Sequence, residues 1–125
     1  MAIQHEHGKW GEDLAASYLA EHGISVLRRN WRYRRAEIDI IGMDQGILVF
    51  IEVKVRHDAG FGRPELKVDQ RKQRLLIEAG MAYMRSIGHE GEIRFDIISI
   101  LGTPSGTHNL THFKDAFFPG LNYMG

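Results

Sequence analysis

Apolar residues recur with a helical period in two segments of the chain. Over residues 8–22 they share one arc of a helical wheel, with Gly11 near its middle. These apolar residues are Trp10, Leu14, Ala15, Tyr18 and Leu19. Gly23 is expected to end this helix, because glycine adopts the backbone conformation that closes helices. The same periodicity predicts a second amphipathic helix over residues 69–86.

Four other segments have the length and the β-branched content of strands, namely residues 24–31, 37–41, 47–55 and 93–101. The short turn at 42–46 predicts that the second and third strands are antiparallel neighbours. A helix between the third and fourth strands predicts a crossover that makes them parallel. The order αβββαβ therefore predicts an α/β fold, with a mixed four-stranded sheet and helices on both faces. Residues 102–125 are expected to form an irregular tail, with His108 and His112 as ordinary loop histidines.

The composition adds few constraints. A chain of 125 residues with 43% hydrophobic and 26% charged residues fits a single globular domain, 1–125, with its core at about 8–101. It contains no cysteine, which excludes disulfides and thiolate metal sites and fits a reducing, cytoplasmic compartment. We expect no membrane partner, because no signal-like start is visible and the longest apolar run, 47–51, cannot cross a bilayer. The formal net charge is zero, so only the distribution of charge can indicate a partner.

Charged residues stand at the ends of two of the predicted strands. Glu52 and Lys54 lie two residues apart on one face of the third strand, and the hairpin should bring Asp39 beside Glu52. Three charged groups this close together at the edge of a core destabilise the fold unless a bound cation balances the carboxylates. Carboxylates of Asp39 and Glu52, with the Val53 carbonyl, are suitable oxygen ligands for Mg²⁺ or Mn²⁺. The pattern indicates metal-dependent phosphodiester hydrolysis, in which Lys54 either positions or deprotonates the attacking water or stabilises the transition-state charge.

Simpler explanations remain open for each of these acids. Glu52 and Lys54 are also compatible with a surface salt bridge, and Asp39 with a partner among the nearby arginines. Glu12 borders the apolar arc of the first helix and can lean over the sheet, whereas Asp13 points to the opposite side. A first-turn acid is also favoured by the helix dipole alone. Glu37 is a possible outer ligand, or a strand-end residue paired with Arg34 or Arg35.

Basic residues form two groups that flank the acidic motif in sequence. One group precedes the second strand and has Trp31 and Tyr33 between its arginines; the other surrounds the start of the second helix. Arginines interleaved with aromatic rings can bind a phosphate backbone and stack on bases. Any single one of them is more simply explained as part of a solvated surface. The candidate nucleic-acid contacts are Arg32, Arg34, Arg35, Arg56, Lys67, Arg71 and Lys72.

Together these residues resemble the YraN family of bacterial proteins, and the match runs in order over nearly the whole chain. It is carried by Gly11-Glu12 with the following Ala-x-x-Tyr-Leu, by Ala36-Glu-Ile-Asp-Ile-Ile, by Leu48-Val-Phe-Ile-Glu-Val-Lys-Val-Arg56, by Lys72-Gln-Arg-Leu, by Arg94-Phe-Asp-Ile and by His112-Phe-Lys-Asp-Ala-Phe. That family is similar to the archaeal Holliday-junction resolvases and to the PD-(D/E)xK, restriction-endonuclease-like nucleases.

The resemblance implies a restriction-endonuclease-like core and a Mg²⁺-dependent endonuclease acting on DNA, including branched DNA, as a homodimer. It assigns the helix acid to Glu12, the metal-binding acid to Asp39, and the E-x-K pair to Glu52 and Lys54. The chain departs from the family in having Ala36 where glycine is usual. It also lacks the glutamine–tyrosine helix signature of RecB-like exonucleases, which argues against a processive exonuclease. A non-catalytic nucleic-acid-binding module and a small scaffold protein remain the alternatives.

Overall fold

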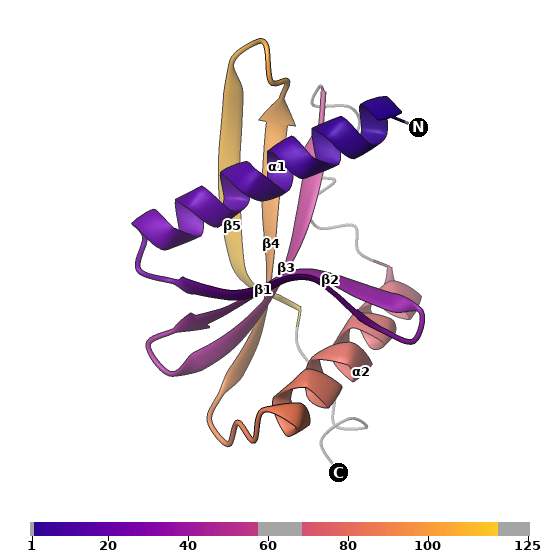
Figure 1. Ribbon diagram of the computed structural model, residues 1–125, viewed down its shortest axis with the longest axis vertical. Helices are drawn as coiled ribbons and strands as arrows, with labels where there is room; N and C mark the ends of the chain where they lie inside the picture. Colours follow the sequence, from indigo (N-terminus) through magenta and orange to yellow (C-terminus); the bar gives the residue numbers. More distant parts are fainter. Residues whose placement is uncertain (1, 58–68, 118–125) are drawn as a thin grey trace.

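Two helices and five strands make up the part of the chain described by the computed structural model, residues 2–57 and 69–117, with side chains described from residue 8 onward. In chain order they are α1 (Ala2–Glu21), β1 (Ser25–Tyr33), β2 (Ala36–Asp44), β3 (Ile47–Arg56), α2 (Gln70–Ser86), β4 (Ile93–Gly102) and β5 (His108–Phe117). The strands form one sheet in the order β1-β2-β3-β4-β5 (Figure 1). Only β3 and β4 are parallel neighbours, so the fold is α/β with a mixed sheet, as predicted.

Both predicted helices and the four predicted strands are present, with shifted ends. Asp69 is the N-cap residue of α2, and its carboxylate accepts a 2.8 Å hydrogen bond from the Lys72 backbone N–H. This N-cap satisfies a donor that the helix itself leaves unpaired. Gln45 and Gly46 have φ values of 50° and 88° and form the two-residue turn between β2 and β3. Left-handed backbone at both positions matches the twist of an antiparallel hairpin.

The prediction of a four-stranded sheet with an irregular tail is wrong, because residues 108–117 form a fifth strand. β5 pairs antiparallel with β4 at one edge of the sheet and carries both His108 and His112, so neither is a loop histidine. The register shifts near Phe117, close to Asp115 with its φ of 54°. An edge strand has one neighbour and few buried positions, so its apolar residues need not alternate. The sequence pattern therefore resembled that of a loop.

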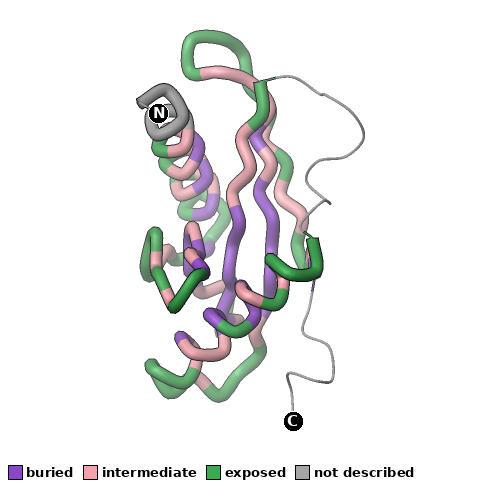
Figure 2. Tube along the Cα trace, turned by 90° about the vertical axis from the view of Figure 1, so that its right-hand side faces the viewer, coloured by how far each residue is buried: buried purple, intermediate pink, exposed green. Residues whose placement is uncertain are grey.

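Each face of the sheet is covered by one helix. On one face Ala15 and Leu19 of α1 pack in a cluster with isoleucines and valines of β2, β3 and β4. On the other face Leu76 and Tyr83 of α2 pack with a cluster that includes Phe95. Buried residues are concentrated along the central strands (Figure 2). Within the described residues, neither helix combines the length and the apolar character needed to cross a membrane.

β2 and β3 are paired over only part of their lengths. Their ladder starts at the turn and ends at the pair Ile40 and Ile51. Beyond it β2 continues to Ala36 beside β1, while β3 continues to Arg56 beside β4. The sheet therefore forks, and the β1–β2 hairpin turns away from β3, β4 and β5 (Figure 1). At the base of the fork, backbone and side-chain groups of β2 and β3 are therefore not occupied by pairing between these two strands.

Gly11 stands at a close contact between α1 and β3. A Cβ atom added at this position would overlap Cγ2 of Val55, whereas nothing lies within 4 Å of a Cβ added at Gly8. We expect Gly11→Ala to lower the free energy of unfolding by about 1–3 kcal/mol through overpacking. The control Gly8→Ala should raise it by about 0.5–1 kcal/mol through helix propensity. Urea denaturation measures both, and a stabilised Gly11→Ala variant would refute the close contact.

Candidate active site

Asp39 and Glu52 stand at the base of the fork, one residue beyond the last β2–β3 pair on each strand. Asp39 Oδ2 accepts a 2.8 Å hydrogen bond from the backbone N–H of Val53, so this carboxylate takes the place of a ladder partner. Glu52 is 7% exposed although it is an acid, and Asp39 is half-buried. The hairpin thus brings the two predicted carboxylates together, as the sequence spacing required.

The proximity of these carboxylates is energetically unfavourable when both are charged. Burial, reinforced by the charge of Glu52 and a hydrogen bond with its side chain, raises the pKa of Asp39 to about 8. The Val53 N–H acts in the opposite direction, and the charge of Glu12 adds a smaller increase. An acid held so far from its usual pKa, in contact with a second acid, is characteristic of functional sites.

Two lysines supply positive charge on the same side of the fork. Lys54 follows Glu52 on β3, and burial lowers the pKa of its amine, although Glu52 opposes that shift and Lys72 adds to it. Lys72 reaches in from the first turn of α2 and forms an ion pair with Glu52. Burial acts to lower the pKa of Lys72, but its hydrogen bond to Glu52 and the charges of Glu52 and Asp39 raise it overall.

The donor set at the fork suits a hard divalent cation. N–H and C=O groups of one strand residue point to the same side, so the Val53 carbonyl faces the fork together with the N–H bonded to Asp39. Two carboxylates and a carbonyl are ligands that Mg²⁺ accepts while it keeps several waters. In the described part of the chain, no three His, Asp or Glu side chains converge closely enough to hold a metal ion. The fork is therefore suited to a cation that takes two carboxylate ligands from the protein.

Glu12 lies near this pair but does not form a three-acid cluster with it. Its two carboxylate oxygens accept hydrogen bonds from Asn30 at 2.9 Å and Arg29 at 3.5 Å. The same Asn30 amide donates to Glu37 at 2.9 Å. Glu37 also pairs with Arg32 at 3.4 Å, rather than with either arginine that the sequence suggested. Glu12 as a direct metal ligand remains a prediction.

Sequence reasoning missed Asn30, which links these two acids from the middle of β1. Asn30 has a φ of 52°, a left-handed conformation that asparagine tolerates better than most residues. An asparagine inside a predicted strand was the available signal, because asparagine is depleted from strands. Its amide holds the Glu12 and Glu37 side chains on one side of the fork.

The predicted nucleic-acid contacts are spread around the fork. Arg34 and Arg35 are exposed at the β1–β2 turn, while Arg32, Arg56 and Arg71 are also exposed. Lys72 is also exposed, and its amine pairs with Glu52. Lys67 lies outside the described residues. Trp31 and Tyr33 are half-buried and stack on each other, which makes them part of the packing against α2.

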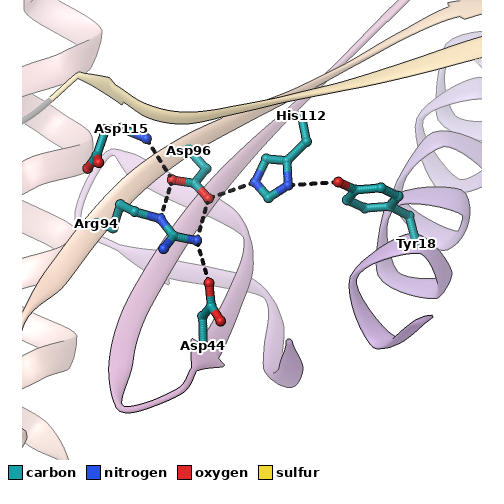
Figure 3. Close-up of polar contacts among 6 residues, drawn as sticks. All are labelled: Tyr18, Asp44, Arg94, Asp96, His112 and Asp115. Atoms are coloured by element: carbon teal, nitrogen blue, oxygen red, sulfur yellow. Dashed lines mark hydrogen bonds and ion pairs between the residues drawn. The ribbon is translucent and has the colours of Figure 1, made fainter. Parts of the chain in front are cut away.

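A second polar cluster, also missed, lies under β5 and away from the fork (Figure 3). Asp96 of β4 is fully buried and accepts hydrogen bonds from Arg94, from His112 and from the Asp115 N–H. His112 also contacts the Tyr18 hydroxyl at 3.1 Å, which ties β5 to α1. The Arg94-x-Asp96 spacing repeats that of Glu52-x-Lys54, so the same signal could have found it.

The model of the family described as "Uncharacterised protein family UPF0102" matches residues 11–100. The chain belongs to the UPF0102 family. This confirms the YraN resemblance, which is the same family. A UPF0102 protein of Bacteroides thetaiotaomicron is 40% identical over 121 residues, covering 97% of this chain and 99% of the relative. One from Chlorobium phaeobacteroides is 43% identical over 119 residues, covering 90% and 94%.

The matched UPF0102 region contains the whole fork, from Glu12 to Lys72. A UPF0102 protein of Flavobacterium psychrophilum is likewise 42% identical over 118 residues, with 94% of this chain and 98% of the relative covered. Coverage of this extent means that these relatives correspond to this chain over nearly their entire lengths. The names of these relatives state a family and no reaction, so the reaction has to be inferred from the side chains at the fork.

Proposed function

We propose that this UPF0102 protein is a metal-dependent endonuclease that hydrolyses phosphodiester bonds in DNA. The observation that carries the proposal is the placement of Asp39 and Glu52 just beyond the last β2–β3 pair, with the amine of Lys54 two residues along. Two adjacent carboxylates at the edge of the core destabilise the metal-free fold, and the raised pKa of Asp39 reflects this destabilisation. A bound divalent cation would remove it.

The residues that would hold Mg²⁺ or Mn²⁺ are Asp39 and Glu52 through their carboxylates and Val53 through its carbonyl. When bound, such an ion neutralises charge on the phosphate and acidifies a water. The Val53 N–H orients the Asp39 carboxylate through Oδ2. The Asn30 amide keeps Glu12 beside the site, where its negative charge adds to the attraction for a cation.

Lys54 is the residue proposed to act on the attacking water. Burial lowers the pKa of its amine, which increases the fraction of neutral amine able to accept a proton. Lys72 pairs with Glu52 and would offer its charge to a phosphate oxygen of the substrate. Exposed arginines at the β1–β2 turn and on α2 supply the attraction for a polyanion.

The finer parts of the proposal are a restriction-endonuclease-like core, branched DNA as substrate and a homodimer as the active form. A forked mixed sheet with helices on both faces and acids at the base of the fork is compatible with that core. Two opposed strands of a branched substrate require two active sites, which a dimer provides. Analytical ultracentrifugation with and without a four-way junction distinguishes one copy from two on the substrate.

The proposal is tested by incubating the purified chain with labelled linear, single-stranded and four-way-junction DNA, with Mg²⁺, Mn²⁺ or EDTA. We expect cleavage that requires the metal and disappears in Glu52→Gln, because the amide cannot replace the carboxylate charge. Glu92→Gln is the matched control, since Glu92 is an exposed acid immediately before β4.

The outcomes separate the proposal from its alternatives. Binding that weakens with salt, without cleavage of any substrate, would identify a non-catalytic nucleic-acid-binding module instead. Neither binding nor cleavage would leave a scaffold whose acids only form salt bridges. Equal cleavage by the parent chain and by Glu52→Gln would assign the activity to a contaminant or to another site.

A further inference from the structure

A small cavity lies between the β1–β2 turn and α2, separate from the acids of the fork. Its volume is about 220 Å³, and it is lined by Tyr33, Arg34, Arg35, Leu75 and Glu78. Three of these residues come from the tip of the hairpin and two from one side of α2. The lining thus combines an aromatic ring, two guanidinium groups, an aliphatic side chain and a carboxylate.

The hairpin tip is held in an unusual conformation. Tyr33 and Ala36 are paired, so Arg34 and Arg35 form a two-residue connection, in which Arg34 has a φ of 56°. A left-handed arginine is disfavoured, and such residues are concentrated at ligand-binding positions. The conformation places the Arg34 guanidinium 5.2 Å from the centre of the Tyr33 ring.

Aromatic packing fixes that ring against the body of the protein. Tyr33 stacks on Trp31 with centroids 6.1 Å apart and planes within 7° of parallel. Trp31 in turn meets the Tyr83 ring edge to face at 5.1 Å, which joins β1 to α2. Arg34 therefore lies over a ring that is held in place by packing, and its flat guanidinium can serve as a platform for another planar group.

The carboxylate of Glu78 decides which planar group fits. A phosphate would be attracted by the two arginines but repelled by this exposed acid. An amino group on a nucleobase instead offers N–H donors that a carboxylate accepts, as it does from cytosine N4. In the described part of the structure the side chain of Glu78 makes neither a hydrogen bond nor an ion pair. The chemistry of the lining thus favours a base that carries an exocyclic amine.

The cavity is close to the fork along α2. Leu75 and Glu78 follow Lys72 by three and six residues, or roughly 5 and 9 Å along the helix axis. Lys72 is the residue paired with Glu52. A strand whose phosphate lay at the fork would therefore have a neighbouring base within reach of the cavity, provided that base were not paired in a duplex.

We propose that this cavity binds an unpaired, amino-bearing nucleobase next to the phosphate at the fork, with stacking on Arg34 and a hydrogen bond to Glu78. The inference rests on the proposed nuclease function and gives it a preference for single-stranded segments of a branched substrate.

Fluorescence anisotropy of labelled dC12 and dT12 with the full chain, at pH 7.5 in EDTA to prevent cleavage, tests the cavity. Cytosine carries an exocyclic amine where thymine carries a carbonyl acceptor, so we expect dC12 to bind about 3–10-fold more tightly, the value of one hydrogen bond. Glu78→Ala should abolish the preference, whereas Glu78→Gln should retain part of it, because its amide oxygen still accepts. Glu21→Ala, which removes an exposed acid of α1, is the control for net charge.

Equal affinities in the parent chain, or a preference that survives Glu78→Ala, would overturn the inference. The measurement does not depend on cleavage, so the two proposals fail separately. A chain that cleaves DNA but binds dC12 and dT12 equally lacks the base site alone. A chain that prefers dC12 but cleaves no DNA supports the base site and overturns the nuclease.

Discussion

Asp39→Asn is expected to lower the rate of DNA cleavage at least about 100-fold while making the metal-free protein more stable at pH 8. The loss follows from removing one of two proposed metal-binding carboxylates. The gain follows from the environment of Asp39, where burial and Glu52 raise the pKa to about 8 from an ordinary value of 3.8. Asparagine has the same shape and no charge, and its amide oxygen can still accept the Val53 N–H.

The sign of the pH dependence is fixed by proton binding. Between pH 3.8 and about 8 the folded chain retains a proton on Asp39 that the unfolded chain releases. This contribution therefore lowers the free energy of unfolding as pH rises through that window. Because Asp39 is part-exposed and titrates together with Glu52, we expect a gain of only about 1–3 kcal/mol for Asp39→Asn at pH 8, and almost none near pH 4.

Thermal denaturation of both chains at pH 5 and pH 8, with and without Mg²⁺, measures this effect. Metal should stabilise the parent chain by mass action and leave Asp39→Asn nearly unchanged, which reverses their order. Glu37→Gln is the matched control, because Glu37 is two residues away and bonded to Asn30 and Arg32 rather than to Glu52. A variant less stable than the parent in metal-free buffer at pH 8 would be incompatible with strain at the fork.

Asp96→Asn should produce the second large effect, a loss of about 3–5 kcal/mol in the free energy of unfolding. Asp96 has no exposed surface and accepts from Arg94 Nε at 2.9 Å, from His112 Nε2 at 2.7 Å and from the Asp115 N–H at 3.1 Å (Figure 3). Asparagine would remove the charge that compensates the buried guanidinium and would present an amide donor to two existing donors. The nearby Asp44 carboxylate, 3.0 Å from Arg94, compensates only part of that loss.

Urea denaturation at pH 7 measures the loss, and acid conditions provide a second readout. Although burial acts to raise it, the bonds from His112, Arg94 and the Asp115 N–H lower the pKa of Asp96 overall below 3.8. Its stabilising contribution is therefore present above pH 3.8 and lost as the pH falls through the lower, folded-state pKa. The difference between variant and parent should shrink in that acidic range.

Lys9→Gln provides the control for Asp96→Asn. Lys9 is 77% exposed in a surface pair with Asp13, and exposed pairs contribute little to stability. We expect no measurable shift of the urea midpoint for this variant. If Asp96→Asn behaved in the same way, the cluster beneath β5 would not be a stabilising element of the fold.

The sequence predicted the helices from the period of their apolar residues and the first four strands from their length and β-branched content. Period-3.6 and period-2 patterns follow from backbone geometry, so they survive without tertiary information. β5 lacks such a pattern, because it carries an inward-facing histidine and a register shift near Phe117. Its position depends on contacts with β4 and α1, which no local pattern contains.

The candidate site shows the same division. Glu52-x-Lys54 at the end of an apolar run, with Asp39 one hairpin away, was sufficient to place two carboxylates and an amine together. Only the tertiary structure showed that the β2–β3 ladder stops beside them, and that Glu12 is bonded to Asn30 and Arg29.

Sequence alone determined the two helices, the first four strands in the order αβββαβ, and the family, because these depend on local residue patterns and on motifs found in the same order. Tertiary structure alone decided the fifth strand, the fork, the burial that raises the pKa of Asp39, and the pairing of Lys72 with Glu52. Each of these results from side chains or strands that are distant in sequence and meet only when the sheet is assembled. Their energies depend on burial and distance, which a linear pattern does not specify.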